Sequence, residues 1–206
     1  MAEGRTAQDF VSPFTLCAPP SALRPHGTRM KNQILWQWVD RPGHEAARVI
    51  ERVLSGTSVF AHDAKPVSLD YEIACDDDWR TRDVRVHGWV GERRIDVDIR
   101  VDGGVWTMNG SEVEAVRGCV DVDLNFSPIT NLLPIRRLDL KVGDAQLVTA
   151  AWLRFPSFAL EPLSQRYTRI DETHVHYQSL ASNFEALLTI DEGGLVLDYA
   201  GVWKQA

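Results

Sequence analysis

The fold is decided by residues 84–101, which read Val-Arg-Val-His-Gly-Trp-Val-Gly-Glu-Arg-Arg-Ile-Asp-Val-Asp-Ile-Arg-Val. From Ile95 to Val101 every second residue is apolar and each residue between is charged. Successive side chains of a strand point to opposite faces, so this alternation predicts strands with one buried and one solvated face. The two halves are joined through Gly91, and we interpret them as a β-hairpin.

The same alternation recurs from Gln33 to the end of the chain. About a dozen short strand-like runs are separated by turn residues, of which Asn109-Gly110 is the strongest hairpin signal. Short links join antiparallel neighbours, because parallel strands need long crossovers. So many strands in one sheet must split or curl around a space. We therefore predict a mainly all-β fold: a large curved antiparallel sheet, or unclosed β-barrel, with room for one short helix.

Two segments fit either a strand or a short helix. Residues 45–54 carry apolar side chains at helical spacing and are followed by Gly56, so a strand and a short helix both fit. Residues 179–188 are ambiguous in the same way. In residues 137–141, Leu138 and Leu140 alternate with charged residues, which predicts a strand. Pro134 favours an extended Leu133 just before that strand.

The composition separates a leader from one domain. Residues 1–32 contain four prolines and several charges, with no apolar run of a secretory signal, and we predict a disordered leader. No repeat or low-complexity tract interrupts residues 33–206, which we predict to be a single β domain.

Charge and cysteine content narrow the partners and the compartment. The net charge is -7, from 29 acidic and 22 basic residues, which disfavours nucleic acid. No apolar run reaches 18 residues, so we expect no transmembrane segment. Cys17, Cys75 and Cys119 form no CxxC motif and are too few for a disulfide framework, which favours a cytoplasmic protein. These features do not set the oligomeric state.

The common catalytic motifs are missing. The sequence has no GxSxG, Walker A, GxGxxG, HExxH or EF-hand pattern. His174 and His176 share one face of a predicted strand and could chelate a metal, but a solvated strand face is the simpler interpretation. We interpret the acidic run that starts at Asp76 as a solvated turn. We therefore predict no metal, no cofactor and no catalytic residue.

Two aspartates deserve separate treatment. Asp121 and Asp123 flank Val122 and point to one face, and their nearest basic partners in sequence are Arg136 and Arg137. One interpretation is an exposed cross-strand charge pair worth less than about 1 kcal/mol. The other is a polar cluster at the mouth of a cavity, where it would hold a sugar or another headgroup. The sequence leaves both open.

Residues 118–138 carry a family resemblance. They read Gly-Cys-Val-Asp-Val-Asp-Leu-Asn-Phe-Ser-Pro-Ile-Thr-Asn-Leu-Leu-Pro-Ile-Arg-Arg-Leu, and with residues 102–106, 151–156, 165–167 and 194–199 they resemble a glycolipid-binding family of bacterial proteins. The resemblance covers about residues 33–206. It implies a curved antiparallel structure similar to an unclosed barrel, the shape of bacterial lipoprotein carriers that hold acyl chains in an apolar cavity.

The function that follows from this resemblance is non-catalytic binding of a lipid or glycolipid. An acyl chain would lie on the apolar concave face, where each buried CH₂ contributes ~0.8 kcal/mol. Aromatic faces stack on sugars and polar groups bond their hydroxyls. The expected headgroup lining is Trp106, Asp121, Asp123, Asn131, Arg136, Arg137, Trp152, Gln165 and Tyr167.

Two other functions stay open at this point. An enzyme acting on a small ester, carbonyl or sugar in the same cavity would use acidic and basic groups near His174 and His176. A protein-interaction module without a small ligand would have a filled interior and an exposed sheet edge.

Overall fold

The computed structural model describes residues 31–206; residues 1–30, most of the expected leader, lie outside the described part. The first half of the described chain is a series of antiparallel strands: β1 (Gln33–Trp38), β2 (Gly43–Ile50), β3 (Val53–His62), β4 (Lys65–Cys75), β5 (Thr81–Val90), β6 (Arg93–Asp102), β7 (Val105–Met108) and β8 (Ser111–Glu112). Residues 31 and 32, which we had placed in the leader, already bond to the domain: the Lys31 N–H donates to Asp191 and the Asn32 carbonyl accepts from Val49.

The middle of the chain holds the helical turns. The 3₁₀ turn η1 (Glu114–Val116) precedes the short strand β9 (Val122–Leu124), and η2 (Pro128–Asn131) leads directly into α1 (Leu132–Leu138). Strands then resume to the end of the chain: β10 (Ala145–Arg154), β11 (Ala159–Arg169), β12 (His174–Ser179), β13 (Phe184–Ile190), β14 (Val196–Tyr199) and β15 (Trp203–Gln205).

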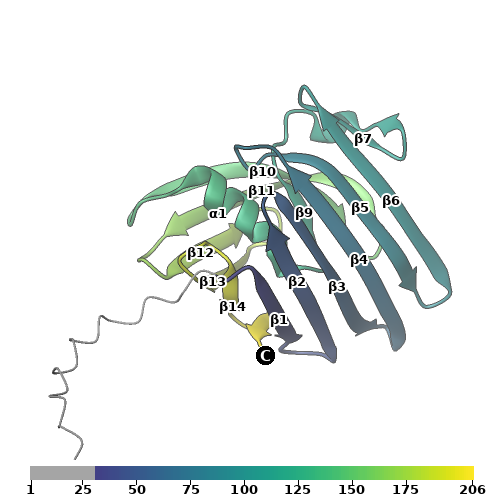
Figure 1. Ribbon diagram of the computed structural model, residues 1–206, viewed down its shortest axis with the longest axis horizontal. Helices are drawn as coiled ribbons and strands as arrows, with labels where there is room; N and C mark the ends of the chain where they lie inside the picture. Colours follow the sequence, from purple (N-terminus) through teal and green to yellow (C-terminus); the bar gives the residue numbers. More distant parts are fainter. Residues whose placement is uncertain (1–30) are drawn as a thin grey trace, which may run out of the picture.

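The strands of residues 31–206 form one sheet in the order β8-β7-β6-β5-β4-β3-β2-β1-β15-β14-β13-β12-β11-β10-β9. The neighbouring pairs are antiparallel except β9 and β10, which are parallel. The sheet ends on β8 and β9 without joining them, so the predicted unclosed barrel is confirmed. Figure 1 shows β2–β7 as one curved wall, β10–β13 as the other, and α1 between them.

The prediction of a strand at Leu138 and Leu140 is wrong, because Leu138 is the last residue of α1 and Leu140 follows the helix outside any strand. The parallel pairing of β9 and β10 requires a crossover, and a helix is the usual one. Pro134 is the third residue of α1, where its missing N–H has no intrahelical partner to lose. The extended geometry expected for Leu133 is therefore also wrong.

The two segments that fitted a helix are strands. Residues 45–54 include the end of β2, a tight turn at Glu51 and Arg52, and the start of β3. Glu51 adopts a positive φ of 55°, as a tight turn between two strands demands. Residues 179–188 likewise contain the turn between β12 and β13.

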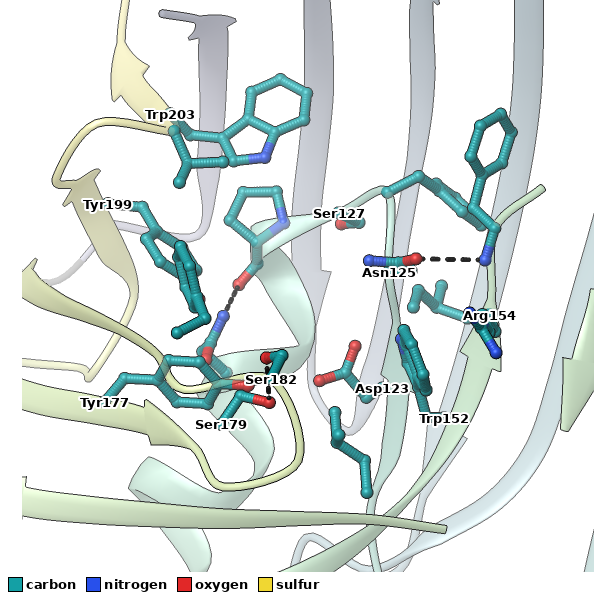
Figure 2. Close-up of a pocket in the computed structure, with 18 of the residues that line it drawn as sticks. Asp123, Asn125, Ser127, Trp152, Arg154, Tyr177, Ser179, Ser182, Tyr199 and Trp203 are labelled. Atoms are coloured by element: carbon teal, nitrogen blue, oxygen red, sulfur yellow. Dashed lines mark hydrogen bonds between the residues drawn. The ribbon is translucent and has the colours of Figure 1, made fainter. Parts of the chain in front are cut away.

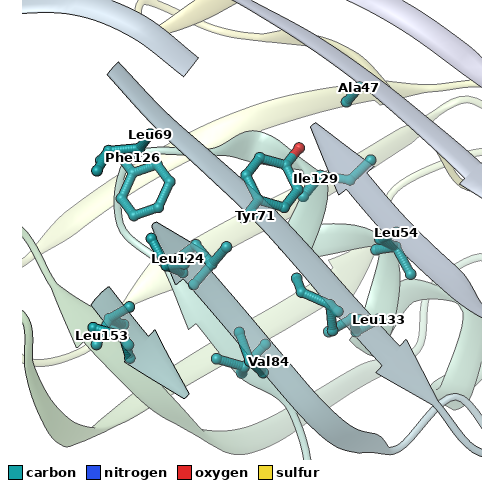
Figure 3. Packing of buried hydrophobic residues seen from close by; sticks show 14 of the residues in the cluster. Ala47, Leu54, Leu69, Tyr71, Val84, Leu124, Phe126, Ile129, Leu133 and Leu153 are labelled. Atoms are coloured by element: carbon teal, nitrogen blue, oxygen red, sulfur yellow. The ribbon is translucent and has the colours of Figure 1, made fainter. Parts of the chain in front are cut away.

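The concave face of the sheet is covered by residues Val116–Leu138, which we name the plug. The plug residues Leu124, Ile129 and Leu133 are completely or almost completely buried, in one cluster with Leu54 and Val84 of the curved wall. Figure 3 shows this packing from close by. The expectation of an apolar concave face open to an acyl chain is therefore not met where the plug lies.

Short contacts join the curved wall to the plug and to the β10–β11 turn of the other wall, across the open side of the barrel. The backbone N–H of Thr81 on β5 donates to the Val120 carbonyl at 3.1 Å, and the Thr81 hydroxyl accepts from the Val122 N–H at 3.0 Å. Arg93 on β6 donates to the carbonyls of Pro156 and Ser157 in the β10–β11 turn. These contacts hold the sheet in its curved shape although the barrel is not closed by strand pairing.

One glycine makes room for a buried hydroxyl. Gly56 on β3 pairs with Tyr71 on β4, and the Tyr71 side chain lies over it. A Cβ at position 56 would lie 2.7 Å from Tyr71 Cζ and overlap the hydroxyl. The absence of a side chain at Gly56 thus lets the Tyr71 hydroxyl reach the Glu45 carboxylate.

We expect Gly56→Ala to destabilise the protein by about 1–3 kcal/mol, the usual cost of overpacking a core. Urea unfolding followed by tryptophan fluorescence measures the change. Ser55→Ala, one residue earlier on β3, is the control and should change stability by less than about 0.5 kcal/mol. Equal stability of Gly56→Ala and the wild type would contradict the close packing of Tyr71.

Candidate ligand-binding cavity

A cavity of about 870 Å³ opens at the end of the barrel where β1, β3, β10, β12 and β14 finish. Binding pockets for small molecules range from about 300 to 1,000 Å³. Figure 2 shows Trp203 and Tyr199 on one side, Trp152 and Arg154 on the other, and Asp123 between them. The plug forms the floor, because residues 124–128 also line the cavity.

Aromatic rings from four separate strands and turns build one wall. The ring centroid of Trp38 on β1 lies 4.9 Å from that of Phe60 and 4.2 Å from that of Trp203. Phe155 extends the group, 5.3 Å from Phe60. All four rings line the cavity, which gives it a continuous apolar surface of the kind that packs on acyl chains or on the C–H faces of sugars.

A second aromatic group lies on β12–β14. Tyr177 is within 5.9 Å of Tyr199 and 6.3 Å of Phe184, measured between ring centroids. The hydroxyls of Ser179 and Ser182 lie beside these rings and bond each other at 2.9 Å. This side of the cavity therefore combines ring faces with hydroxyl groups (Figure 2).

Asp123 is the polar centre of the cavity. Its Oδ2 accepts a 2.6 Å hydrogen bond from Gln165 Nε2, which also donates to the Tyr177 hydroxyl at 3.0 Å. Burial raises the pKa of Asp123 to about 6, and the bond from Gln165 opposes that rise. A carboxylate can accept about four hydrogen bonds, so Asp123 keeps capacity for a ligand.

The two arginines that line the cavity are paired. Arg41 donates from Nε and Nη2 to the two carboxylate oxygens of Asp40, at 3.0 and 3.1 Å, and its guanidinium lies over the Trp38 ring. Arg154 lies 3.5 Å from Glu161 and over the Trp152 ring. Asp123 has no such cationic partner among residues 31–206; its bonded neighbour is an amide.

A buried carboxylate fixes the floor of the cavity. Glu45 on β2 is completely buried and accepts hydrogen bonds from three hydroxyls: Ser58 at 2.5 Å, Tyr71 at 2.6 Å and Ser127 at 2.5 Å. Ser127 belongs to the plug, so this network ties the plug to the curved wall. Burial is the largest influence on the pKa of Glu45 and raises it to about 7, while the hydroxyl bonds lower it.

The structure brings five of the expected headgroup residues together. Asp123, Asn131 and Trp152 line the cavity. Gln165 and Tyr167 lie directly behind them: Gln165 bonds Asp123, and the Tyr167 hydroxyl donates to Asn131 Oδ1 at 3.0 Å. These two are placed to orient the cavity residues.

Asp121 and Arg137 lie away from the cavity, paired with each other. Arg137 donates from Nε and Nη2 to the two oxygens of Asp121, at 3.0 and 2.5 Å. Asp121 is buried and Arg137 mostly so, which is neither of the two arrangements the sequence left open. The pair anchors α1 beside β9.

Arg136 and Trp106 have structural partners as well. Arg136 donates to the Gly193 carbonyl at 2.7 Å and lies over the Trp79 ring. These partners replace the expected pairing with Asp121 or Asp123. Trp106 is fully buried, and its indole N–H donates to the Cys119 carbonyl at 2.9 Å. Neither side chain lines the cavity.

Several cavity residues were not predicted from the sequence. Trp38, Phe60 and Trp203 come from strands far apart in the chain, so only the complete fold brings them together. Glu45 did carry a signal: it is in phase with Gly43 and Ala47, the inward-facing residues of β2. An acidic residue in such a position needs buried partners.

His174 and His176 alternate with the buried Val175 and Tyr177, so they face away from the interior. Each lies beside an acidic residue: His174 is 2.9 Å from Asp171, and His176 is 3.4 Å from Glu185. Residues 31–206 contain no group of three or more potential ligands arranged to hold a metal ion. The hypothesis of an enzyme using these histidines in the cavity therefore loses its motivation.

Fold and cavity together define an unclosed, plugged β-barrel with a mixed aromatic and polar cavity at one end. The chain belongs to the family described as "Putative glycolipid-binding", whose model matches residues 33–205. It is similar to a DUF1089 family protein from Pseudomonas aeruginosa known from a crystal structure, with 30% sequence identity and a TM-score of 0.75. That match covers 91% of this chain and 100% of the other. No curated protein matches the sequence.

The Glu45 network predicts a pH dependence of stability. The folded state raises the pKa of Glu45 from 4.5 to about 7, so its contribution to stability is complete below pH 4.5 and is lost as the pH rises through about 7. Glu45→Gln cannot ionise and lacks this component. As the pH rises from 4.5 to above 7, we expect the free energy of unfolding of the wild type to fall relative to that of Glu45→Gln, by up to about 3 kcal/mol.

Urea unfolding of both proteins at several pH values from 4 to 8 measures this shift. Glu72→Gln, an exposed carboxyl on β4, serves as the control and should not reproduce it. A difference between wild type and Glu45→Gln that does not change with pH would contradict the assigned ionisation of Glu45.

Proposed function

We propose that this protein binds a lipid or glycolipid in the cavity at the open end of the barrel, without catalysing a reaction. The observation that carries the proposal is the cavity itself: about 870 Å³ of space with a continuous aromatic wall and the half-buried carboxylate of Asp123. Membership of a family whose description names glycolipids supports the same ligand class.

The two aromatic groups and the polar centre suggest how such a ligand would lie. The acyl part packs against Trp38, Phe60 and Trp203, where each buried CH₂ contributes ~0.8 kcal/mol. The headgroup lies near Asp123 and Trp152, with Gln165 and Tyr167 holding the polar side chains in place. Association itself costs ~4–15 kcal/mol, so the affinity depends on both parts of the ligand.

We assign the other expected residues a supporting role in this function. Asp121 with Arg137, and Arg136 with Trp79, fix α1 against the sheet and thereby fix the plug that forms the cavity floor. Trp106 packs in the core. We also propose a cytoplasmic location, because Cys75 and Cys119 are free thiols, as is usual in a reducing compartment. None of the helices in residues 31–206 is long and apolar enough to cross a membrane.

The direct test is native mass spectrometry of the full chain purified from bacteria, with uptake of a fluorescent glycolipid analogue as a second readout. We expect a co-purifying lipid-sized adduct and saturable uptake. Ala181→Trp places a large ring in the cavity from an exposed turn, so the fold should tolerate it, and uptake should fall by about tenfold or more.

Thr149→Trp is the matched control, because Thr149 is exposed on β10 and does not line the cavity. Its uptake should equal that of the wild type. If the wild type carries no adduct and takes up no analogue, or if Ala181→Trp binds like Thr149→Trp, the proposed function is wrong.

A further inference from the structure

The charges around the cavity are unequal. Its lining contains three carboxylates, Asp40, Asp123 and Glu161, against two guanidinium groups, Arg41 and Arg154. Arg41 lies beside Asp40 and Arg154 beside Glu161, so neither arginine pairs with Asp123. His62, the other basic residue of the lining, lies 3.4 Å from Asp63. A ligand that enters therefore meets one carboxylate that no cation neutralises.

Asp123 is also placed to make strong contacts. It lies between Trp152 and the Ser179–Ser182 pair (Figure 2). Gln165 holds one of its oxygens, which fixes the orientation of the carboxylate. Burial of an ionised carboxylate without a cation is costly, and that cost is relieved when hydroxyl groups of a ligand donate to its free acceptor sites.

We propose that Asp123 selects ligands with an uncharged, hydroxyl-bearing headgroup and rejects anionic ones. This inference rests on the proposed function and deepens it. Two hydroxyls of a sugar can donate to the Asp123 oxygens while the sugar ring packs on the Trp152 face. A phosphate or sulfate in that position would bring a second negative charge beside the first, and like charges in a desolvated site repel strongly.

A cationic headgroup is the rival ligand, and two features oppose it. The Arg154 guanidinium lies 5.3 Å from the centroid of the Trp152 ring, on the side of the cavity where the headgroup would pack. Ser179 and Ser182, on the other side of Asp123, offer hydroxyls rather than further charge (Figure 2). These hydroxyls can bond the hydroxyls of a polyol, and they do little to stabilise a cationic headgroup beside the Arg154 guanidinium.

Three probes with the same octyl chain separate these possibilities: octyl glucoside, octyl sulfate and octyltrimethylammonium. Isothermal titration calorimetry with the full chain, below the micellar concentration of each probe, gives the affinities. We expect octyl glucoside to bind at least about tenfold more tightly than either charged probe, since hydrogen bonds from sugar hydroxyls to an ionised carboxylate are stronger than those between neutral groups.

Asp123→Asn keeps the shape and removes the charge. This substitution should weaken the binding of octyl glucoside by about tenfold or more and strengthen the binding of octyl sulfate. The preference for the glucoside over the sulfate should therefore shrink or reverse. Glu161→Gln removes the partner of Arg154 and should also strengthen octyl sulfate. Asp83→Asn makes the same charge change at an exposed residue of β5 and should leave all three affinities as they are.

The outcomes distinguish this inference from the function on which it rests. If octyl sulfate binds the wild type as tightly as octyl glucoside, or if Asp123→Asn leaves the preference unchanged, the role of Asp123 is wrong while lipid binding stands. If octyltrimethylammonium binds most tightly of the three probes, the proposed role of Asp123 is wrong and the site is one for cationic headgroups. If no probe binds the wild type, the proposed function fails together with this inference.

Discussion

The hydrogen bonds between Glu45 and three hydroxyl groups are the constraint on which the rest of the structure depends. A buried carboxylate without partners costs several kcal/mol, so its position is acceptable only when the hydroxyls of Ser58, Tyr71 and Ser127 all reach it. Two of these come from the curved wall and one from the plug. The network therefore fixes where the plug lies against β2, β3 and β4, and the lack of a side chain at Gly56 allows it.

The position of the plug decides what the barrel can contain. A curved sheet of this many strands without a plug would enclose a long apolar hollow. Here the plug fills one part of it with Leu124, Ile129 and Leu133, and the space that is left is the cavity at the open end. This division explains why the cavity is polar on one side: Asp123 and Ser127 come from the same segment that fills the core.

The alternation of apolar and polar residues predicted the fold class well, because side-chain burial in a sheet depends on a local period of two. The same rule failed at Leu138 and Leu140, because Leu138 ends α1 and Leu140 follows it within the crossover that parallel β9 and β10 need. That pairing joins strands about twenty residues apart, and no local pattern records it. Residues 118–138, which carry the family resemblance, lie within the plug, but the resemblance implied an open apolar concave face and no plug.

Only part of the cavity lining could be predicted from the sequence, for a similar reason. Asp123 was identified because its paired spacing with Asp121 made both aspartates stand out, yet only the fold shows that Arg137 belongs to Asp121 alone. Trp38 and Trp203 are neighbours because β1 pairs with β15, although these two strands come from opposite ends of the domain's sequence. Glu45 shows the signal that was overlooked: an acidic residue in phase with buried neighbours on a strand.

The central claim is that the plug is a fixed part of the core and that a ligand occupies the space it leaves. A crystal structure of the protein with a bound neutral glycolipid tests this most directly. The account predicts a headgroup between Asp123 and Trp152, an acyl chain along Trp38 and Trp203, and an unbroken bond from Ser127 to Glu45. A ligand lying between the plug and the sheet, with Ser127 displaced from Glu45, would contradict it.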